Sequence, residues 1–403
     1  MHKDFKFGVV RKDVKTNFKY NDLKNLSKID SVSPPSVFVG SKLKYPFMNV
    51  GILSPLQREE DVSIYDDAKL WAEKDFGIDD VIRLRDNLLN SRFMSKATDS
   101  RFSKRFVGIA QEIAVASRPV DVEIELKRKL YFDKRRDKVL VHQGMSAPLK
   151  GAKITENVKI NRKVDKVMND EIKSKEGIEF LYKNNFDEYA LSKILSVGVL
   201  GLQKDKRFVP TRWSITATDD IISKKILQRV REYRWIEDYE FFFGEFLGNQ
   251  YMIMLFPNVW SFELFELYYP GSSWNPSKDF KVSTDNEWFE NRKTYARNTA
   301  GGYYATRLPI IEYLDFIKRQ ASVLVIRLET TSYWASLGVW VVRESVRKAL
   351  KNKMRFVSKE ELMTSVKKIS KIKYDFQCEY ILKKSKLFEK ISVQRNLNKW
   401  FNH

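Results

Sequence analysis

The spacing of hydrophobic residues predicts both helices and strands in the first part of the chain. Apolar residues recur every three or four positions over residues 64–117, which predicts helices that end at Pro119. Residues 120–126 alternate strictly between apolar and polar types, so we expect a half-buried strand there, with residues 138–142 as a plausible partner.

Aromatic residues dominate three runs in the second half of the chain, at residues 239–247, 250–256 and 261–269. Gly-Asn and Pro-Asn pairs separate the runs, and these turn-forming pairs predict an antiparallel meander. Residues 303–321 predict a long helix with a kink at Pro309. Together, these patterns predict a mixed α+β protein.

Shorter patterns add further elements. Short or buried strands are expected at residues 37–40, 47–53, 323–329 and 337–342. Thr218-Asp219-Asp220 has the composition of a helix start, since acids favour the positive end of the helix dipole. Ser358-Lys359-Glu360-Glu361 is a capping box that begins a basic helix.

Composition divides the chain into five segments. They are a loosely ordered N-terminal segment (1–34), an N-terminal lobe (35–149), a charged linker or insertion (150–180), a central lobe (181–350), and a basic C-terminal helix with a flexible tail (351–403).

The chain carries a large positive charge that is concentrated near its C-terminus. Lys and Arg number 73, and Asp and Glu number 52, among 403 residues, which gives a formal net charge of +21. Residues 347–403 hold 16 basic and 5 acidic residues. Adaptation to high temperature would raise both signs together, so this imbalance favours contact with nucleic acid over a merely solvated basic surface. Such contact would be non-specific and would weaken with salt.

Composition also excludes several classes of protein. No apolar run approaches the roughly 18 residues that a membrane helix needs, and the charged start does not resemble a signal peptide. We therefore expect a cytoplasmic protein without a membrane partner. Cys378 is the single cysteine, which excludes an internal disulfide and a zinc site with two cysteine ligands. The three histidines share no local spacing, so neither a metal site nor a cofactor is expected.

The last ten residues contain a Gln followed by apolar residues at positions +3, +6 and +7. These residues are Gln394, Leu397, Trp400 and Phe401. In a 3₁₀-like turn, positions +3 and +6 lie on one side, so the apolar side chains form one plug and the Gln amide binds separately. This is the pattern of the peptide that docks on the sliding clamp PCNA, a PIP box. The alternative is a terminal turn that packs on its own core.

Five internal blocks are rich in turns, arginines and small residues. They are residues 35–40 (PSVFVG), 117–121 (SRPVD), 209–216 (VPTRWSIT), 300–308 (AGGYYATRL) and 337–344 (LGVWVVRE). Together with the terminal octet, and in this order, they resemble the archaeal DNA repair family NreA/NreB over residues 34–345 and the tail. The Arg-Trp-Ser and Gly-Gly-Tyr-Tyr motifs are specific as blocks.

The resemblance implies a role in DNA damage repair and recruitment to PCNA through the terminal peptide. Members of the family often carry a four-cysteine segment before the Pro-Ser-x-Phe-Val-Gly block, whereas residues 1–34 of this chain contain no cysteine. A zinc-dependent role of that segment is therefore not expected here. The resemblance supplies no catalytic residue.

The same blocks suggest a pocket for a phosphate or a nucleotide. Gly301 and Gly302 directly precede a predicted helix, where backbone N–H groups can approach an anion closely. Arginines near them are suited to bidentate contact with phosphate. The candidate residues are Arg212, Ser214, Arg297, Asn298, Gly301, Gly302, Tyr303, Arg307, Arg343 and Glu344. The alternative is a tight helix entry in which the arginines form buried structural ion pairs.

Three functional hypotheses follow. The first is a DNA repair protein that PCNA recruits and whose basic body contacts DNA or a nucleotide-like ligand. The second is an enzyme that acts on nucleic acid or a nucleotide through the Arg/Gly-rich pocket. Asp219, Asp220 and His142 are candidates for its chemistry, although helix capping is the simpler role for the aspartates. The third is a structural RNA-binding protein.

Overall fold

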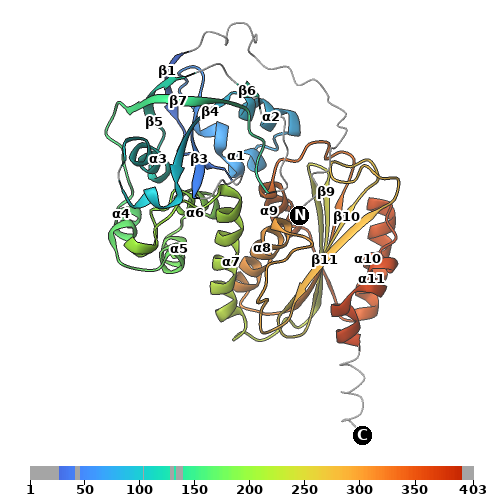
Figure 1. Cartoon of the computed structure of the whole chain (residues 1–403). Helices are drawn as coiled ribbons and strands as arrows, with labels where there is room; N and C mark the ends of the chain where they lie inside the picture. The colour runs from blue at the N-terminus through green and yellow to red at the C-terminus, as the bar shows by residue number, and fades with distance from the viewer. Residues whose placement is uncertain (1–26, 41–45, 103, 128–130, 133–138, 393–403) are drawn as a thin grey trace. The chain divides into compact units, whose positions relative to one another are not determined.

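The computed structural model describes residues 27–40, 46–102, 104–127, 131–132 and 139–392, and the chain divides into two compact units (Figure 1). The first unit comprises the described residues up to Ile222 together with Ser336–Gly338. The second unit comprises Ser223–Ala335 and the described residues from Val339 onward. Each unit is built on a sheet of its own.

The first unit combines a sheet with short helices. Its strands are β1 (Lys28–Ser33), β2 (Val37–Val39), β3 (Phe47–Pro55), β4 (Leu88–Lys96), β5 (Val120–Leu126), β6 (Tyr131–Phe132) and β7 (Met145–Ile154). Its helices are α1 (Ala68–Glu73), α2 (Ile78–Asp86), α3 (Arg105–Val115), α4 (Arg162–Asn169), α5 (Ser174–Lys183), α6 (Glu188–Ser196) and the start of α7 (Thr211–Val230). Short 3₁₀ helices lie at Ser63–Asp66, Ala97–Arg101 and Gln203–Asp205.

The sheet of the first unit curls toward a barrel. Its strand order is β1-β5-β7-β4-β3-β2, with β6 paired to β7. Hydroxyls on β1 donate across to β3: Ser31 Oγ lies 2.9 Å from the Pro55 carbonyl oxygen, and Ser33 Oγ lies 2.6 Å from that of Leu53. β1 is at one end of the strand order and β3 is next to the other end, so these hydrogen bonds require the sheet to curve strongly.

The second unit is a sheet with helices on both faces (Figure 1). Its strands are β8 (Tyr239–Phe246), β9 (Asn249–Phe256), β10 (Ser261–Tyr268), β11 (Lys281–Glu287), β12 (Ser322–Glu329) and β13 (Lys353–Phe356). Its helices, besides the end of α7, are α8 (Gly301–Phe316), α9 (Val339–Ala349), α10 (Lys359–Tyr374) and α11 (Glu379–Lys384). The strand order is β11-β10-β12-β9-β8-β13. β10 and β12 run parallel, with α8 in the connection between them.

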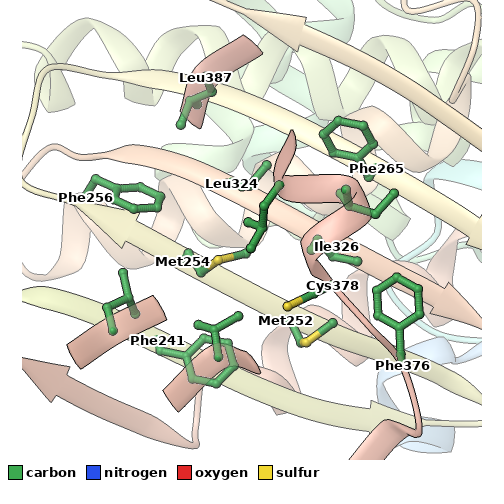
Figure 2. Packing of buried hydrophobic residues seen from close by; sticks show 14 of the residues in the cluster. Phe241, Met252, Met254, Phe256, Phe265, Leu324, Ile326, Phe376, Cys378 and Leu387 are labelled. Atoms are coloured by element: carbon green, nitrogen blue, oxygen red, sulfur yellow. The ribbon is translucent and has the colours of Figure 1, made fainter. Parts of the chain in front are cut away.

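One face of the second sheet is apolar and packs against the C-terminal helical segment. Figure 2 shows this cluster, in which sheet residues meet Phe376, Cys378 and Leu387. The sheet contributes Phe241, Met252, Met254, Phe256, Phe265, Leu324 and Ile326. Burying a large apolar side chain stabilises a fold by about 1.5–3 kcal/mol, so this cluster anchors α10 and α11 to the sheet.

The predicted α+β class is confirmed. The strands expected at residues 37–40, 47–53, 120–126 and 323–329 are β2, β3, β5 and β12, and the three aromatic runs are β8, β9 and β10. Ser358 caps α10 as predicted, because its hydroxyl accepts a hydrogen bond from the Glu361 N–H at 3.2 Å.

Two segments have the opposite secondary structure to the one predicted. Residues 88–96 lie in the predicted helical region but form β4, which pairs with β3 and β7; local periodicity does not report such long-range pairing. Residues 337–342 were expected to form a strand, but Val339 begins helix α9. All four residues Val339–Val342 are buried, and a continuous apolar run does not distinguish a buried helix from a strand.

The pairing of strands also differs from the prediction. Residues 139–142 form a loop, and β5 pairs with β1 and β7 instead. β8 and β9 form the expected hairpin, but β12 lies between β9 and β10, so the aromatic strands are not a simple meander. Every residue of β12 is buried, which suits a central position in the sheet.

The structure divides the chain at a different place from the composition. The boundary falls inside α7, after Ile222, rather than at residues 150–180. Residues 150–180 form the end of β7, α4 and part of α5, and α4 buries Val164 and Val167. High charge on the outer side of amphipathic helices produced the linker-like composition. Residues 28–33, within the predicted loose N-terminal segment, form strand β1.

Candidate functional site

A row of polar residues crosses four neighbouring strands on the face of the second sheet that packs against α8. The polar row consists of Asn249 and Tyr251 on β9, Arg327 and Glu329 on β12, Glu266 and Tyr268 on β10, and Asp285 on β11. The strand register places them on one side, because directly paired residues share a face of a sheet. All seven are buried.

Arg327 is the centre of the polar row. It donates to Glu266 Oε1 from Nη1 at 2.6 Å and to Asn249 Oδ1 from Nη2 at 2.6 Å. Nη2 also lies 3.2 Å from Glu329 Oε2. The second oxygen of Glu266 accepts from the Tyr268 hydroxyl at 2.8 Å. A buried guanidinium is tolerated at such a position because carboxylates and an amide oxygen surround it.

The surroundings of Tyr268, Tyr303 and Arg327 fix the ionisation of these side chains at neutral pH. Burial is the main cause that raises the pKa of Tyr268 and Tyr303 well above 10.0. Burial alone would lower the pKa of Arg327, but Tyr251 and the nearby carboxylates raise it instead. The tyrosines therefore remain neutral donors and the arginine remains charged, so none of them acts as a base near neutral pH.

The N-terminus of α8 lies against the polar row. A Cβ atom at Gly302 would lie 2.2 Å from Glu266 Oε1, which is closer than real Cβ atoms come to an oxygen. The Thr306 Oγ1 atom, further along α8, lies 3.5 Å from the Tyr251 hydroxyl. The glycine therefore allows the helix start to approach a carboxylate of the chain itself.

Asp285 accepts hydrogen bonds from backbone N–H groups just before α8. Its Oδ2 atom accepts from the backbone N–H groups of Asn298 and Thr299 and from Thr299 Oγ1, each at 2.9 Å. Its other oxygen lies 2.8 Å from Arg292 Nη2. The sequence suggested that backbone donors here bind a phosphate. In the structure the N–H groups of Asn298 and Thr299, just before the predicted donors of Gly301 and Gly302, already bind an anion that belongs to the protein. The Gly302 N–H group donates to the Thr299 carbonyl oxygen at 3.1 Å.

Arg307 forms a buried ion pair. Its Nη1 atom lies 2.7 Å from Glu287 Oε2, and both side chains are fully buried. Trp260 Nε1 donates to the other oxygen of Glu287 at 3.2 Å, and the Tyr303 and Tyr304 rings each lie 5.5 Å from the guanidinium carbon. For Arg307, this arrangement is the buried structural ion pair that is the alternative to a phosphate contact.

The other candidates of the predicted pocket lie on several elements. Arg297 is exposed, whereas Arg343 on α9 is buried. Glu344 pairs with Arg347 at 2.7 Å. Arg212 and Ser214 belong to the first unit, at the start of α7, where Ser214 Oγ donates to the Thr211 carbonyl at 2.9 Å. The ten candidate residues are thus divided between the two units.

Sequence reasoning did not identify the acids that hold these arginines. Glu266, Asp285 and Glu287 lie on β10 and β11, and Arg327 lies in a strand that is otherwise almost entirely apolar. A charge inside a strand with a continuous apolar pattern requires a buried partner. Arg327 within residues 322–329 therefore indicated that a buried acidic partner exists. The sequence did not indicate which residue that partner is.

The first unit contains a second ionic cluster, centred on Asp66. Asp66 Oδ1 lies 2.5 Å from Arg85 Nη1, and Oδ2 lies 2.7 Å from Lys193 Nζ. Ser36 Oγ, from the first of the five blocks, donates to Oδ2 at 2.5 Å. Burial would raise the pKa of Asp66, but Lys193 and Arg85 outweigh it and lower the pKa below 3.8. Arg85 also donates to the His142 carbonyl at 3.1 Å, which ties the cluster to the loop before β7.

His142, Asp219 and Asp220 are the remaining candidates for catalysis from the sequence. His142 Nε2 lies 2.7 Å from Asp86 Oδ1. Asp219 and Asp220 do not start a helix, because α7 already begins at Thr211.

Among the described residues, no group of three or more His, Cys, Asp and Glu side chains is placed to hold a metal ion. Within the same ranges, every helix is too short or too polar to span a bilayer.

Exposed lysines cover the outer side of α10 and α11. This lysine face consists of Lys367, Lys368, Lys371, Lys383, Lys384 and Lys386. The inner side of the same segment buries Leu362, Val366 and Ile381 in the apolar cluster. Tyr380 is exposed among the lysines, and Lys384 Nζ lies 4.0 Å from its ring centroid. The lysine face can contact a polyanion without disturbing the core.

The terminal peptide directly follows the lysine face in the chain. Gln394, Leu397, Trp400 and Phe401 lie outside the residues that the structure describes. The docking of this peptide on PCNA therefore stays a prediction from sequence.

Fold and site together define a two-unit α+β protein with buried ionic clusters and a basic C-terminal surface. Comparison with protein families identifies its group. Residues 9–275 match the family described as archaeal Nre, N-terminal, and residues 287–400 match archaeal Nre, C-terminal. The chain belongs to the archaeal Nre family, which confirms the resemblance seen in the sequence blocks.

Similar curated proteins agree with this assignment. A DNA repair protein NreA of Haloferax volcanii is 40% identical over 326 residues, 79% of this chain and 77% of that protein. A DNA repair protein NreA of Archaeoglobus fulgidus is 40% identical over 353 residues, 86% and 87% of the two chains. A DNA repair protein NreB of the same organism is 35% identical over 338 residues, 81% and 84%. No solved structure gave a significant match.

Proposed function

We propose that this chain is a cytoplasmic DNA repair protein that is recruited to PCNA by its C-terminal peptide and contacts DNA through its basic surface. Its three similar relatives are named DNA repair proteins, and they cover most of its length. The terminal octet is the observation that carries the recruitment. Gln394, Leu397, Trp400 and Phe401 have the spacing typical of PCNA-docking peptides, and the family match extends through residue 400.

The position of the lysine face supports joint binding of DNA and the clamp. The lysine face ends at Lys386, eight residues before Gln394. Two weak contacts on one chain act together, because binding of the first raises the effective concentration of the second. The proposal therefore requires neither a tight peptide nor a sequence-specific DNA site.

Calorimetry with PCNA tests the recruitment. The full chain should bind PCNA, and a chain that ends at Ser392 should lose binding. Leu397→Ala combined with Phe401→Ala should weaken binding at least tenfold, because both belong to the predicted apolar plug. Asn398→Ala combined with Lys399→Ala is the matched control, since these residues lie outside the pattern, and it should bind nearly as the full chain does. Equal affinity of the full and shortened chains would refute the recruitment.

Salt-dependent binding of duplex DNA tests the lysine face. Lys367→Gln, Lys371→Gln and Lys383→Gln together should weaken duplex binding and reduce the slope of log K against log salt by up to about 3, since each phosphate contact contributes about 0.9. The matched control changes three exposed lysines of the first unit to glutamine, namely Lys153, Lys159 and Lys163. If both triple variants lose the same affinity, DNA binding depends on the overall charge of the protein and not on the lysine face.

A further inference from the structure

One end of the β3–β4 pair in the first unit exposes large apolar side chains to solvent. Phe47 is 40% exposed and Met94 is 62% exposed. Phe47 pairs with Lys96 and Asn49 pairs with Met94, so Phe47, Met94 and Lys96 lie on one face of the two strands. The neighbouring positions Met48 and Val50 point to the other face and are buried. The exposed side chains are therefore not part of the core, which the alternate residues supply.

The chain segment that contains Met94 and Lys96 is positively charged. Residues 92–105 contain five cationic residues, at positions 92, 96, 101, 104 and 105, and a single acidic residue, Asp99. Asp99 is 9% exposed and its Oδ1 atom lies 2.9 Å from Lys104 Nζ, so Asp99 and Lys104 neutralise each other and the segment keeps a net positive charge. Lys96 Nζ lies 5.9 Å from the Phe47 ring centroid. Phe102, in the turn that follows the Ala97–Arg101 helix, is 59% exposed and adds a second aromatic ring to the basic segment.

The chemistry of this surface fits an unpaired nucleotide strand. Single-stranded DNA presents the flat faces of its bases, which stack on aromatic and other apolar side chains, and phosphates, which pair with cations. Duplex DNA hides the faces of its bases, so it would use the cations alone. A protein interface also favours aromatic residues and methionine, but it is depleted in lysine, and Lys96 Nζ lies 5.9 Å from the Phe47 ring within this patch, so an unpaired strand is the better match.

We propose that the β3–β4 patch, formed by Phe47, Met94 and Lys96, is a binding site for single-stranded DNA, and that Phe102, six positions further along the chain, adds an exposed ring to it. The proposal deepens the function proposed above and rests on it for the choice of DNA. It assigns a role to the first unit that differs from that of the lysine face. The lysine face binds phosphates of any strand, whereas the β3–β4 patch selects strands whose bases are unpaired.

The test compares the full chain with Phe47→Ala combined with Met94→Ala. Fluorescence anisotropy with a labelled 12-nucleotide oligo(dT) and with a labelled 12-base-pair duplex gives the two affinities at fixed salt. We expect the variant to weaken binding to the single strand at least tenfold and to leave duplex binding unchanged. The matched control is Phe316→Ala combined with Val357→Ala, two exposed apolar residues of the second unit, and it should bind both DNAs as the full chain does. Equal melting temperatures of the three proteins establish that the fold is kept.

The outcomes separate this inference from the function proposed above. Unchanged single-strand binding by the Phe47/Met94 variant, with duplex and PCNA binding intact, overturns the β3–β4 patch and leaves the repair role standing. Failure of the full chain to bind either DNA refutes the DNA contact itself. Tighter binding of an oligo(U) RNA than of oligo(dT) also overturns the assignment, because the patch would then serve RNA.

Discussion

At the scale of single residues, the chain satisfies its buried charges with partners that are distant in sequence. Arg327 meets Glu266, Arg307 meets Glu287, and Asp66 meets Arg85. Breaking such a buried pair by removing one partner typically costs about 3–5 kcal/mol, because the remaining charge is left without compensation. Small local changes at these clusters should therefore have large effects on stability.

Gly302→Ala should destabilise the protein by about 3 kcal/mol. The new Cβ atom would lie 2.2 Å from Glu266 Oε1, so the buried carboxylate would have to leave Arg327 and Tyr268. Urea unfolding measures the change. Gly108→Ala is the matched control, because Gly108 lies inside α3 and a Cβ there would meet nothing within 4 Å. The control should be neutral or more stable by about 0.5–1 kcal/mol. Similar stability of the Gly302 variant and the native chain would contradict the close approach.

Asp66→Asn should remove an acid-sensitive part of the stability. The pKa of Asp66 in the folded chain is below 3.8, so its charged form favours folding. That contribution is fully present above pH 4 or so, and it is lost as the pH falls through the folded-state pKa. At pH 7 the variant should be less stable by about 3 kcal/mol, and the difference should shrink below about pH 4. Unfolding free energies measured from pH 2 to 7 test this. A difference that stays constant over the whole range would exclude the charge as its cause.

At the scale of elements, α10 combines a core-facing side with a basic outer side. Leu362 and Val366 enter the apolar cluster, and Lys367 and Lys371 face outward. The hydroxyl of Ser358 satisfies a backbone donor at the first turn. This helix was predictable because its cap and its periodicity both lie within one short segment.

Ser358→Ala should lower stability by about 1 kcal/mol, since it removes the N-cap acceptor of the Glu361 N–H group. Thermal unfolding followed by circular dichroism gives the change. Thr364→Ala is the matched control on the same helix: Thr364 is exposed, and its hydroxyl only donates back to the Glu360 carbonyl. The control should be neutral or slightly stabilising. Equal losses for both variants would show that the cap has no special role.

At the scale of the whole molecule, the family matches and the structural units divide the chain differently. The two family matches meet between residues 275 and 287, whereas the units divide after Ile222. β8, β9 and β10 lie in the first match, and β12 and β13 lie in the second. β11 lies between the two matches, apart from its last residue, Glu287. The second sheet therefore needs both matched regions, because β12 separates β9 from β10.

A chain that ends at residue 275 should fail to form the second unit. It would keep β9 and β10 but lose the strand between them, and their unpaired edges favour aggregation. Size-exclusion chromatography and circular dichroism test this against a chain that ends at Ser392. The longer chain retains all described elements and should remain monodisperse and folded. A soluble, cooperatively folded chain 1–275 would contradict the arrangement of the second sheet.

The sequence predicted the elements better than their arrangement. The strands at residues 120–126 and 323–329 and the cap at Ser358 were predictable, since each depends on neighbours within a few positions. β4 and α9 were assigned the wrong secondary structure, because their buried runs fit either type and tertiary contacts decided between them. Among the candidate site residues, Gly302 lies against Glu266 of the polar row and Arg307 pairs with Glu287, but these acidic partners were not predicted.

The sequence by itself determined the charge of the protein, the types of most elements, the family and the terminal octet. Each of these is recorded in residue identity or in spacing over fewer than about twenty positions. Only the tertiary structure decided that β12 divides the aromatic strands and that Asp285 and Glu287 engage the donors near Gly302. Such pairs join positions that are far apart along the chain. Their energy depends on three-dimensional proximity and exclusion of water, which local patterns do not encode.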